Sequence, residues 1–196
     1  PFDDQWRVFL EFVQNAQDAA EEVNGNCNVD FTYRVKDGNR IGTVLIENTG
    51  SVLPRKALTT GFSTKTYNSS ARGKFGEGLK IGCVIAIRLG FNVKIRNGSE
   101  TWEPSFEFAK EYDAEVLGFD IGPGRSEKNR VQVEIQGVDE SYWNEIKGNF
   151  LFINPPTKFI PLENGLILTD PPDQGKVFVK GIFICKNPNL KFGYNF

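Results

Sequence analysis

The start of the chain shows a helical and then an extended pattern of apolar positions. Between residues 2 and 23, apolar side chains recur every three or four positions, which predicts an amphipathic helix ended by residues 24–25. The β-rich runs 29–36 and 41–47 follow, separated by a reverse-turn composition at 37–39. The sequence therefore predicts a helix and then a β-hairpin.

The next region changes from polar to apolar. Residues 49–78 are too polar to form a core and too rich in glycine to be rigid, so we predict a long loop with a short helix near residues 55–60. The apolar segment 79–89 then predicts a buried helix, and residues 91–96 alternate as a strand.

The remaining segments predict further strands and one more helix. Strand patterns cover residues 101–108, 116–121 and 131–135, and a helix is predicted at 139–147. We expect a mostly antiparallel sheet. Further on, proline-rich stretches separate short strands and lead to a hairpin-like segment at 176–185.

Composition and charge narrow the class of protein. A chain of 196 residues with 39% hydrophobic content can bury the core of one compact domain. The net charge of -2 provides no basic field, so we expect no direct binding of nucleic acid or of an anionic membrane. No apolar run has the length of a membrane span and no signal peptide opens the chain, which predicts a soluble domain. Because methionine is absent, we expect a fragment of a longer protein.

The cysteines indicate the redox environment. Cys27, Cys83 and Cys185 are far apart, and the chain has neither a CxxC pair nor a histidine that could complete a zinc site. This pattern favours a reducing, cytoplasmic environment, and we expect Cys83 to pack in the core.

Three polar residues of the first helix are candidates for a site. Glu11, Asn15 and Asp18 are spaced by four and three residues, so they stack along one face of the helix, opposite the apolar stripe. A solvated helix surface would explain the same spacing, so the pattern alone leaves both interpretations open.

A glycine cluster runs directly into the second long helix. Its residues are Gly73, Lys74, Phe75, Gly76, Glu77, Gly78, Leu79 and Lys80. Glycines allow the backbone to approach a phosphate closely, and a helix N-terminus offers N–H groups to an anion. The spacing fits neither a Walker A loop nor a Rossmann fingerprint, and a flexible loop with an ordinary helix start is the alternative.

A third candidate for the site lies at the end of the second predicted strand, at Asn48 and Gly50. Such residues commonly mark only a turn.

The order of these three motifs along the chain resembles the GHKL superfamily, which includes type II topoisomerases, heat-shock chaperones, sensor histidine kinases and mismatch-repair ATPases. The resemblance implies an α+β fold, the two-layer α/β sandwich called the Bergerat fold. It would have a mixed, mostly antiparallel sheet, helices on one face and an ATP lid.

The resemblance also implies residue roles. Residues 11–19 resemble the family's N-box, in which Glu11 would be the general base and Asn15 would hold Mg²⁺ bound to the triphosphate. Residues 73–79 resemble the glycine-rich box that holds the β and γ phosphates, and residues 61–65 resemble the lid entry. The implied nucleotide-binding residues are Asn15, Asp18, Asn48, Gly50, Ser63, Thr64, Lys65, Gly73, Lys74, Phe75, Gly76, Glu77, Gly78, Leu79 and Lys80.

Two positions depart from the family pattern. Aligned on Gly50, Asn48 stands where the family usually has an aspartate that accepts a hydrogen bond from the adenine amino group. An amide oxygen can accept the same bond, but it is uncharged. Shifting the alignment by one would offer Glu47, whose side chain should point to the other face of the sheet. Asn129 stands where relatives often have part of a Gly-Thr pair.

The function implied by the resemblance is a nucleotide-dependent switch. We expect an ATPase domain at 1–153 that binds Mg-ATP and hydrolyses it slowly, with closure of the lid at 61–78 acting as a conformational or dimerisation switch in a larger protein. Residues 154–196 would be a strand-rich extension that packs on the same domain or leads into a missing one. A non-hydrolysing, nucleotide-gated interaction module is the alternative, and a histidine-kinase domain fits less well. Expected partners are the nucleotide, further domains of the same protein and a second copy in an ATP-dependent homodimer.

Overall fold

The protein is described by a computed structural model, which places residues 6–58, 78–124 and 128–196. The chain divides into two compact units, Pro1–Glu140 and Ser141–Phe196. The boundary between them falls at the start of helix α3 (Glu140–Ile146), whereas the sequence interpretation divided the chain after residue 153.

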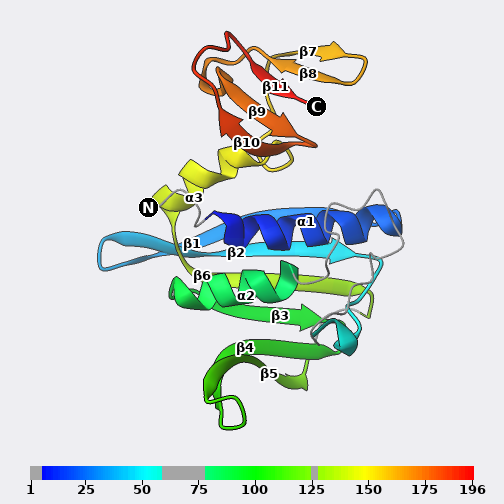
Figure 1. Ribbon diagram of the computed structural model, residues 1–196, viewed down its shortest axis with the longest axis vertical. Helices are drawn as coiled ribbons and strands as arrows, with labels where there is room; N and C mark the ends of the chain where they lie inside the picture. The colour runs from blue at the N-terminus through cyan, green and yellow to red at the C-terminus, as the bar shows by residue number, and fades with distance from the viewer. Residues whose placement is uncertain (1–5, 59–77, 125–127) are drawn as a thin grey trace. The chain divides into compact units, whose positions relative to one another are not determined.

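Within the described residues, the first unit contains two α-helices that precede and follow a β-hairpin, and four further strands (Figure 1). Its elements are α1 (Arg7–Glu22), β1 (Cys27–Lys36), β2 (Asn39–Thr49), the 3-10 helix η1 (Arg55–Leu58), α2 (Gly78–Arg88), β3 (Asn92–Asn97), β4 (Glu100–Ala109), β5 (Ala114–Pro123) and β6 (Arg130–Asp139). Each of these helices and strands was predicted from the hydrophobic pattern, and the structure confirms them with small shifts at their ends.

The strands of the first unit form one sheet with an apolar face. Their order is β1-β2-β6-β3-β4-β5, and every neighbouring pair is antiparallel. Because side chains alternate between the faces of a strand, every second residue of the central strands is buried. These buried residues are Val44, Ile46, Val93, Ile95, Val131, Val133 and Ile135. Helices α1 and α2 contact each other, and they contact β2 and β3 respectively.

The other face of this sheet carries polar bonds between strands. Gln132 Nε2 donates to Glu47 Oε2 at 2.6 Å, and Arg96 Nε donates to Glu134 Oε1 at 2.6 Å. Arg130 lies 3.4 Å from Glu47 and forms an ion pair with it. Apolar and polar positions thus alternate as expected for antiparallel strands that are covered on one side.

The second unit is built on a five-stranded mixed sheet. After α3 its elements are η2 (Lys147–Asn149), β7 (Phe159–Leu162), β8 (Gly165–Leu168), η3 (Pro171–Asp173), β9 (Lys176–Val179), β10 (Ile182–Lys186) and β11 (Gly193–Asn195). The strand order is β10-β9-β11-β8-β7, in which β11 runs parallel to β9 and the other pairs are antiparallel. Phe150, Leu168 and Phe178 are fully buried and form the centre of its core.

The predicted fold class, an α+β two-layer α/β sandwich (Bergerat fold) built on one mixed sheet, is wrong. The described residues form two sheets, of six and five strands, with only three α-helices. The first sheet is antiparallel throughout rather than mixed. The physical reason for the error is that the short strands after residue 154 pair with one another and bury their own core. The predicted lid lies almost entirely in residues 59–77, outside the described residues.

Candidate functional site

Helix α1 places its candidate polar residues toward the interior of the first unit. Asp18 is only 4% exposed, while Glu11 and Asn15 are half-buried. The alternative interpretation, a solvated helix surface, therefore does not hold for Asp18.

The start of helix α2 lies directly against Glu11 and Asn15. A Cβ atom added to Gly78 would lie 2.5 Å from Glu11 Oε2 and 3.2 Å from Asn15 Nδ2. The backbone at this position can approach α1 so closely only because Gly78 has no side chain. The structure thus brings together three predicted site residues, Glu11, Asn15 and Gly78. Glu11 and Gly78 are 67 positions apart in the sequence.

A second close contact sets the distance between the two helices. A Cβ atom at Gly82 would lie 2.9 Å from the ring of Phe12, which is fully buried. Gly82 is one turn of helix beyond Gly78, and Phe12 follows Glu11 directly. The contact between Gly82 and Phe12 therefore holds the first turn of α2 beside the Glu11 carboxylate.

This arrangement has a defined chemistry. The first turn of an α-helix presents N–H groups without partners in the helix, and its dipole favours an anion. A carboxylate and an amide beside that turn can orient a water molecule or help to hold a hard cation. A phosphate bound at the helix start would lie close to both groups.

Asn48 lies at the end of β2 on the buried face of the sheet. It is 4% exposed and follows the buried residues Val44 and Ile46 at period two. Its Nδ2 donates to Ser51 Oγ at 3.3 Å. Glu47, the residue that a shifted alignment would offer, forms a hydrogen bond with Gln132 on the other face of the sheet. The structure thus confirms that the side chains of Glu47 and Asn48 lie on opposite faces.

Sequence reasoning missed Asn97, which fixes the segment after β2. Its side chain is buried at the end of β3, where Nδ2 donates to Leu53 O and Oδ1 accepts from Leu53 N, both at 2.8 Å. Nearby, the N–H of Gly50 donates to the carbonyl of Asn129 at 2.8 Å. Asn97 precedes a glycine, and that dipeptide indicates only a turn, so the sequence held no signal for this role.

The other predicted site residues are only partly described. Leu79 is buried in the core, and Lys80 lines a cavity of about 510 Å³ between α2 and β5. The remaining predicted residues lie within 59–77, outside the described residues; these are Ser63, Thr64, Lys65, Gly73, Lys74, Phe75, Gly76 and Glu77. The roles of these residues, and closure of the lid at 61–78, stay predictions.

The two cysteines of the first unit, Cys27 and Cys83, have thiols with raised pKa values, which makes them unreactive. Burial raises the pKa of the Cys83 thiol to about 12, and Cys83 is fully buried, which confirms its predicted place in the core. Burial, with a smaller effect of the Glu21 and Glu47 carboxylates, raises the pKa of Cys27 to about 11. Among the described residues, no group of three or more His, Cys, Asp or Glu side chains could hold a metal ion, and no helix is long and apolar enough to cross a membrane.

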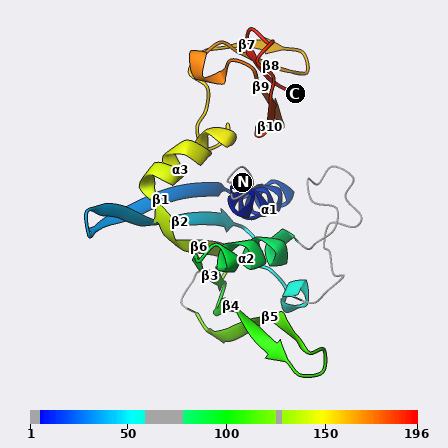
Figure 2. The same ribbon diagram turned by 60° about the vertical axis from the view of Figure 1, so that its left-hand side comes forward.

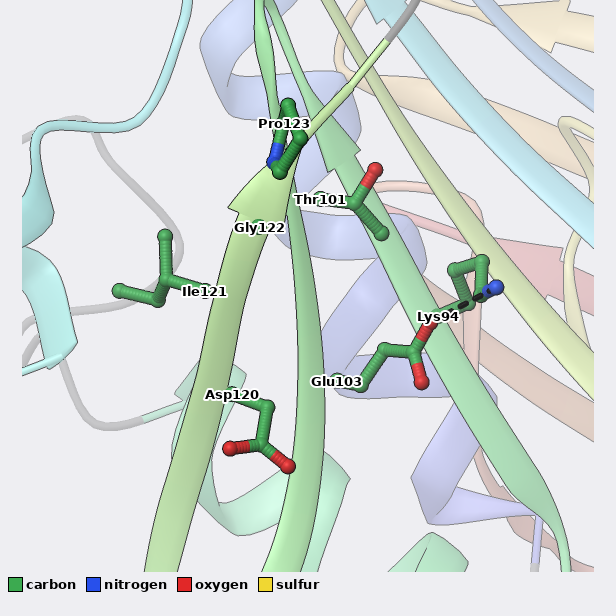
Figure 3. A pocket seen from close by; sticks show the side chains of 7 residues that line it. All are labelled: Lys94, Thr101, Glu103, Asp120, Ile121, Gly122 and Pro123. Carbon is green, nitrogen blue, oxygen red and sulfur yellow. Dashed lines mark ion pairs between the residues drawn. The ribbon is translucent and has the colours of Figure 1, made fainter.

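A second cavity lies on the polar side of the sheet, over β3, β4 and β5 (Figure 3). Its volume is about 380 Å³, and Lys94 forms an ion pair with Glu103 in it at 2.7 Å. Both side chains are partly exposed, and Asp120 lies on the neighbouring strand. The cavity is shallow and its cation is already paired, so it is a weaker candidate site than the contact between α1 and α2.

No protein-family model matches the chain, and a search of curated proteins finds no match.

Proposed function

We propose that the first unit binds Mg-ATP between the start of α2 and the polar face of α1, and that it hydrolyses the nucleotide slowly. The observation that carries this proposal is the position of the Gly78 backbone against Glu11 Oε2 and Asn15 Nδ2. The resemblance to the GHKL superfamily concerns the same residues, and the proposal rests on both.

The two side chains have different parts in this proposal. A carboxylate repels a triphosphate, so Glu11 is suited to accept a proton from the attacking water rather than to contact the phosphates. Asn15 is uncharged and offers an amide oxygen, which is a ligand type that Mg²⁺ accepts together with phosphate oxygens. When bound, Mg²⁺ neutralises part of the charge of the triphosphate. The N–H groups of the first turn of α2 would hold phosphate oxygens.

Asn48 is the residue proposed to select the base. Its NH₂ group donates a hydrogen bond to Ser51 Oγ, which leaves the amide oxygen of Asn48 to serve as the acceptor. An acceptor at this position favours adenine, which carries an exocyclic amino group, over guanine at the same edge. We therefore propose that the site prefers ATP to GTP despite the absence of the family's aspartate.

The test is calorimetric titration of the 196-residue chain with ATP, ADP and GTP in the presence of Mg²⁺, together with a phosphate-release assay. We expect ATP to bind with a micromolar-to-millimolar dissociation constant, and Glu11→Gln to bind ATP but to lose turnover. Glu22→Gln is the matched control, because Glu22 is an exposed glutamate on the same helix.

Three outcomes decide between the candidate functions. Binding with turnover that depends on Glu11 supports the ATPase. Tight binding with no phosphate release over hours supports the alternative, a non-hydrolysing nucleotide-gated module, which the neutral Asn48 favours. Failure of every nucleotide to bind a chain that circular dichroism shows to be folded would refute both.

A further inference from the structure

The outer edge of strand β1 is long and regular. Among the described residues of the first unit, β1 pairs with β2 alone, and their register contains no bulge. Figure 1 and Figure 2 show that the β1–β2 hairpin projects beyond β6, in agreement with the pairing of β2 and β6, which ends at Ile41. A long and straight edge strand is a template for pairing with another chain.

The other edge strands of the two described sheets carry features that hinder pairing. β5 contains Gly118 and ends at Pro123. β7 has only four residues, one of which is Pro161, and β10 contains a register shift. Glycine, proline and bulges weaken or interrupt a ladder of hydrogen bonds, so β1 is the edge that is best suited to add a strand.

The backbone of β1 directs alternate residues toward β2 and away from it. The N–H of Thr49 donates to the carbonyl of Asn26 at 3.0 Å, and the even-numbered residues continue this bonded pattern along β1. The N–H and C=O groups of Val29, Tyr33 and Val35 therefore point away from β2. Val35 is 69% exposed and Tyr33 is 43% exposed. A second strand at this edge would bond to these groups and cover both side chains.

The sequence of β1 is complementary to itself in one antiparallel register. A two-fold axis at Thr32 places residues at equal distances on either side of it opposite each other. Asp30 of one copy then lies opposite Arg34 of the other, and the symmetry repeats this pair. In the same register Val29 lies opposite Val35. Pairs of opposite charge and apolar pairs that face each other across two strands stabilise their pairing.

The charge of Arg34 is not neutralised within one copy. Arg34 is exposed and forms no ion pair with a described carboxylate. Asp30 is exposed, and its Oδ2 accepts a hydrogen bond from Asn28 Nδ2 at 2.9 Å, which leaves Oδ1 for the Arg34 of a second copy. Moving the two-fold axis by one residue in either direction would place Arg34 opposite Asn28 or Thr32, which are uncharged. The charge of Arg34 therefore favours the axis at Thr32.

We propose that two copies of the chain form a homodimer in which β1 pairs antiparallel with its copy about an axis at Thr32, with reciprocal ion pairs between Asp30 and Arg34. The two six-stranded sheets would become one continuous sheet. The resemblance to the GHKL superfamily predicts an ATP-dependent homodimer, whereas this pairing needs no nucleotide, because the contact of Gly78 with Glu11 and Asn15 involves no residue of β1.

The test is analytical ultracentrifugation of the 196-residue chain without nucleotide, at increasing protein concentration. A dimer has twice the mass of the 22.0 kDa chain. Pairing of two strands is at the small end of specific interfaces, so we expect a dissociation constant of about 1–100 μM.

Charge variants test the register of the pairing. Arg34→Glu and Asp30→Lys each place like charges opposite one another twice, so each should raise the dissociation constant at least tenfold. Glu115→Lys is the matched control, because Glu115 is an exposed carboxylate on β5, at the other edge of the same sheet, and this variant should dimerise as the unmodified chain does.

Mixing the two variants provides a readout that a general loss of stability would not produce. In a pair of one Arg34→Glu chain and one Asp30→Lys chain, each of these charges lies opposite a charge of the other sign. The mixture should therefore form a heterodimer at concentrations where neither variant dimerises alone. The proposal is overturned if the unmodified chain stays monomeric up to about 1 mM, if either variant dimerises as strongly as the unmodified chain, or if the mixture contains no heterodimer.

Discussion

The contact between Gly78 and Glu11 gives the sharpest prediction, because adding one methyl group at Gly78 should leave the protein folded but abolish the proposed activity. In Gly78→Ala the new Cβ would lie 2.5 Å from Glu11 Oε2, and ordinary contacts begin at 3.4 Å. The carboxylate oxygen must therefore move by about 0.9 Å. Both atoms that the Cβ would meet within 3.4 Å, Glu11 Oε2 and Asn15 Nδ2, are at the ends of side chains, so they can be displaced without moving the backbone.

The magnitudes decide which effect is larger. Replacing glycine by alanine inside a helix stabilises it by about 0.5–1 kcal/mol, and Gly78 is the first residue of α2, so the gain there is at most this value. The forced displacement costs about 1 kcal/mol, at the low end for overpacking. The free energy of unfolding should thus change by less than about 1 kcal/mol. Displacing a catalytic group by about 1 Å lowers turnover by about 100-fold. We expect Gly78→Ala to remain folded but to lose the proposed ATP hydrolysis.

The measurements are urea unfolding followed by circular dichroism and steady-state phosphate release. Gly122→Ala is the matched control, since a Cβ atom at Gly122 meets nothing within 4 Å. In the background of Glu11→Ala the clash with the carboxylate is removed, so Gly78→Ala should then no longer destabilise the protein, and any gain should stay below about 1 kcal/mol. Turnover of Gly78→Ala within threefold of the unmodified chain would show that Glu11 and Gly78 do not form the hydrolytic site.

Three further predictions concern structure rather than catalysis. Asn97→Ala leaves the N–H and C=O of Leu53 without the two 2.8 Å bonds, so the free energy of unfolding should fall by about 2 kcal/mol in urea titrations. At pH 8 a maleimide reagent should label the exposed Cys185 in the native protein, but it should label Cys83 only after unfolding, because that thiol is buried and its pKa is about 12. Asp170→Asn should destabilise the second unit at pH 7 and flatten its loss of stability below about pH 4, as measured by thermal unfolding at several pH values.

The sign of the Asp170 effect follows from its hydrogen bonds. The N–H of Lys158 donates to Oδ2 at 3.0 Å, and the hydroxyl and N–H of Thr157 donate to the same oxygen at 2.9 and 2.8 Å. These bonds, with the Lys158 N–H contributing most, lower the pKa of Asp170 below its ordinary value. The ionised carboxylate therefore stabilises the folded state above its unfolded pKa of about 3.9, and this contribution is lost as the pH falls through the lower folded pKa. A neutral amide has no such dependence.

Each of the structural predictions has a defined control or refuting result. Asn92→Ala removes an exposed asparagine from the start of the same strand as Asn97, so it should leave stability within about 0.5 kcal/mol of the unmodified chain. Equal destabilisation by both variants would refute the role of Asn97. Native labelling of Cys83 at the rate of Cys185, or an unchanged pH profile in Asp170→Asn, would contradict the other two predictions.

Local patterns predicted the elements, because they record burial along one helix or one strand. The three-and-four spacing in α1 and the period-two alternation in β2 follow from which side chains face the core, and the structure confirms both. The same alternation distinguished Asn48 from Glu47, whose side chains lie on opposite faces. For these features the sequence contains the physical cause in neighbouring residues.

The pattern within one strand does not show which distant strands it pairs with. In the second sheet β11 inserts between β9 and β8, which are adjacent in the sequence but not in the sheet. Any of the short strands 159–162, 165–168 and 176–179 has a pattern that would also suit an edge of the first sheet. The predicted two-layer sandwich did not include this second, five-stranded sheet, because strand pairing is decided by which arrangement buries the most apolar surface.

Contacts within the candidate site also could not be predicted from local sequence patterns. Neither the spacing in α1 nor the glycine cluster indicates that Gly78 lies against Glu11, and only the resemblance of the motif order to the GHKL superfamily assigned both residues to one predicted nucleotide site. Asn97 belongs to no such motif, and its bonds to Leu53 span 44 residues. A contact of that kind becomes visible only in three dimensions, so residues like Asn97, which hold a strand end and its following loop in place, are those that sequence reasoning will systematically miss.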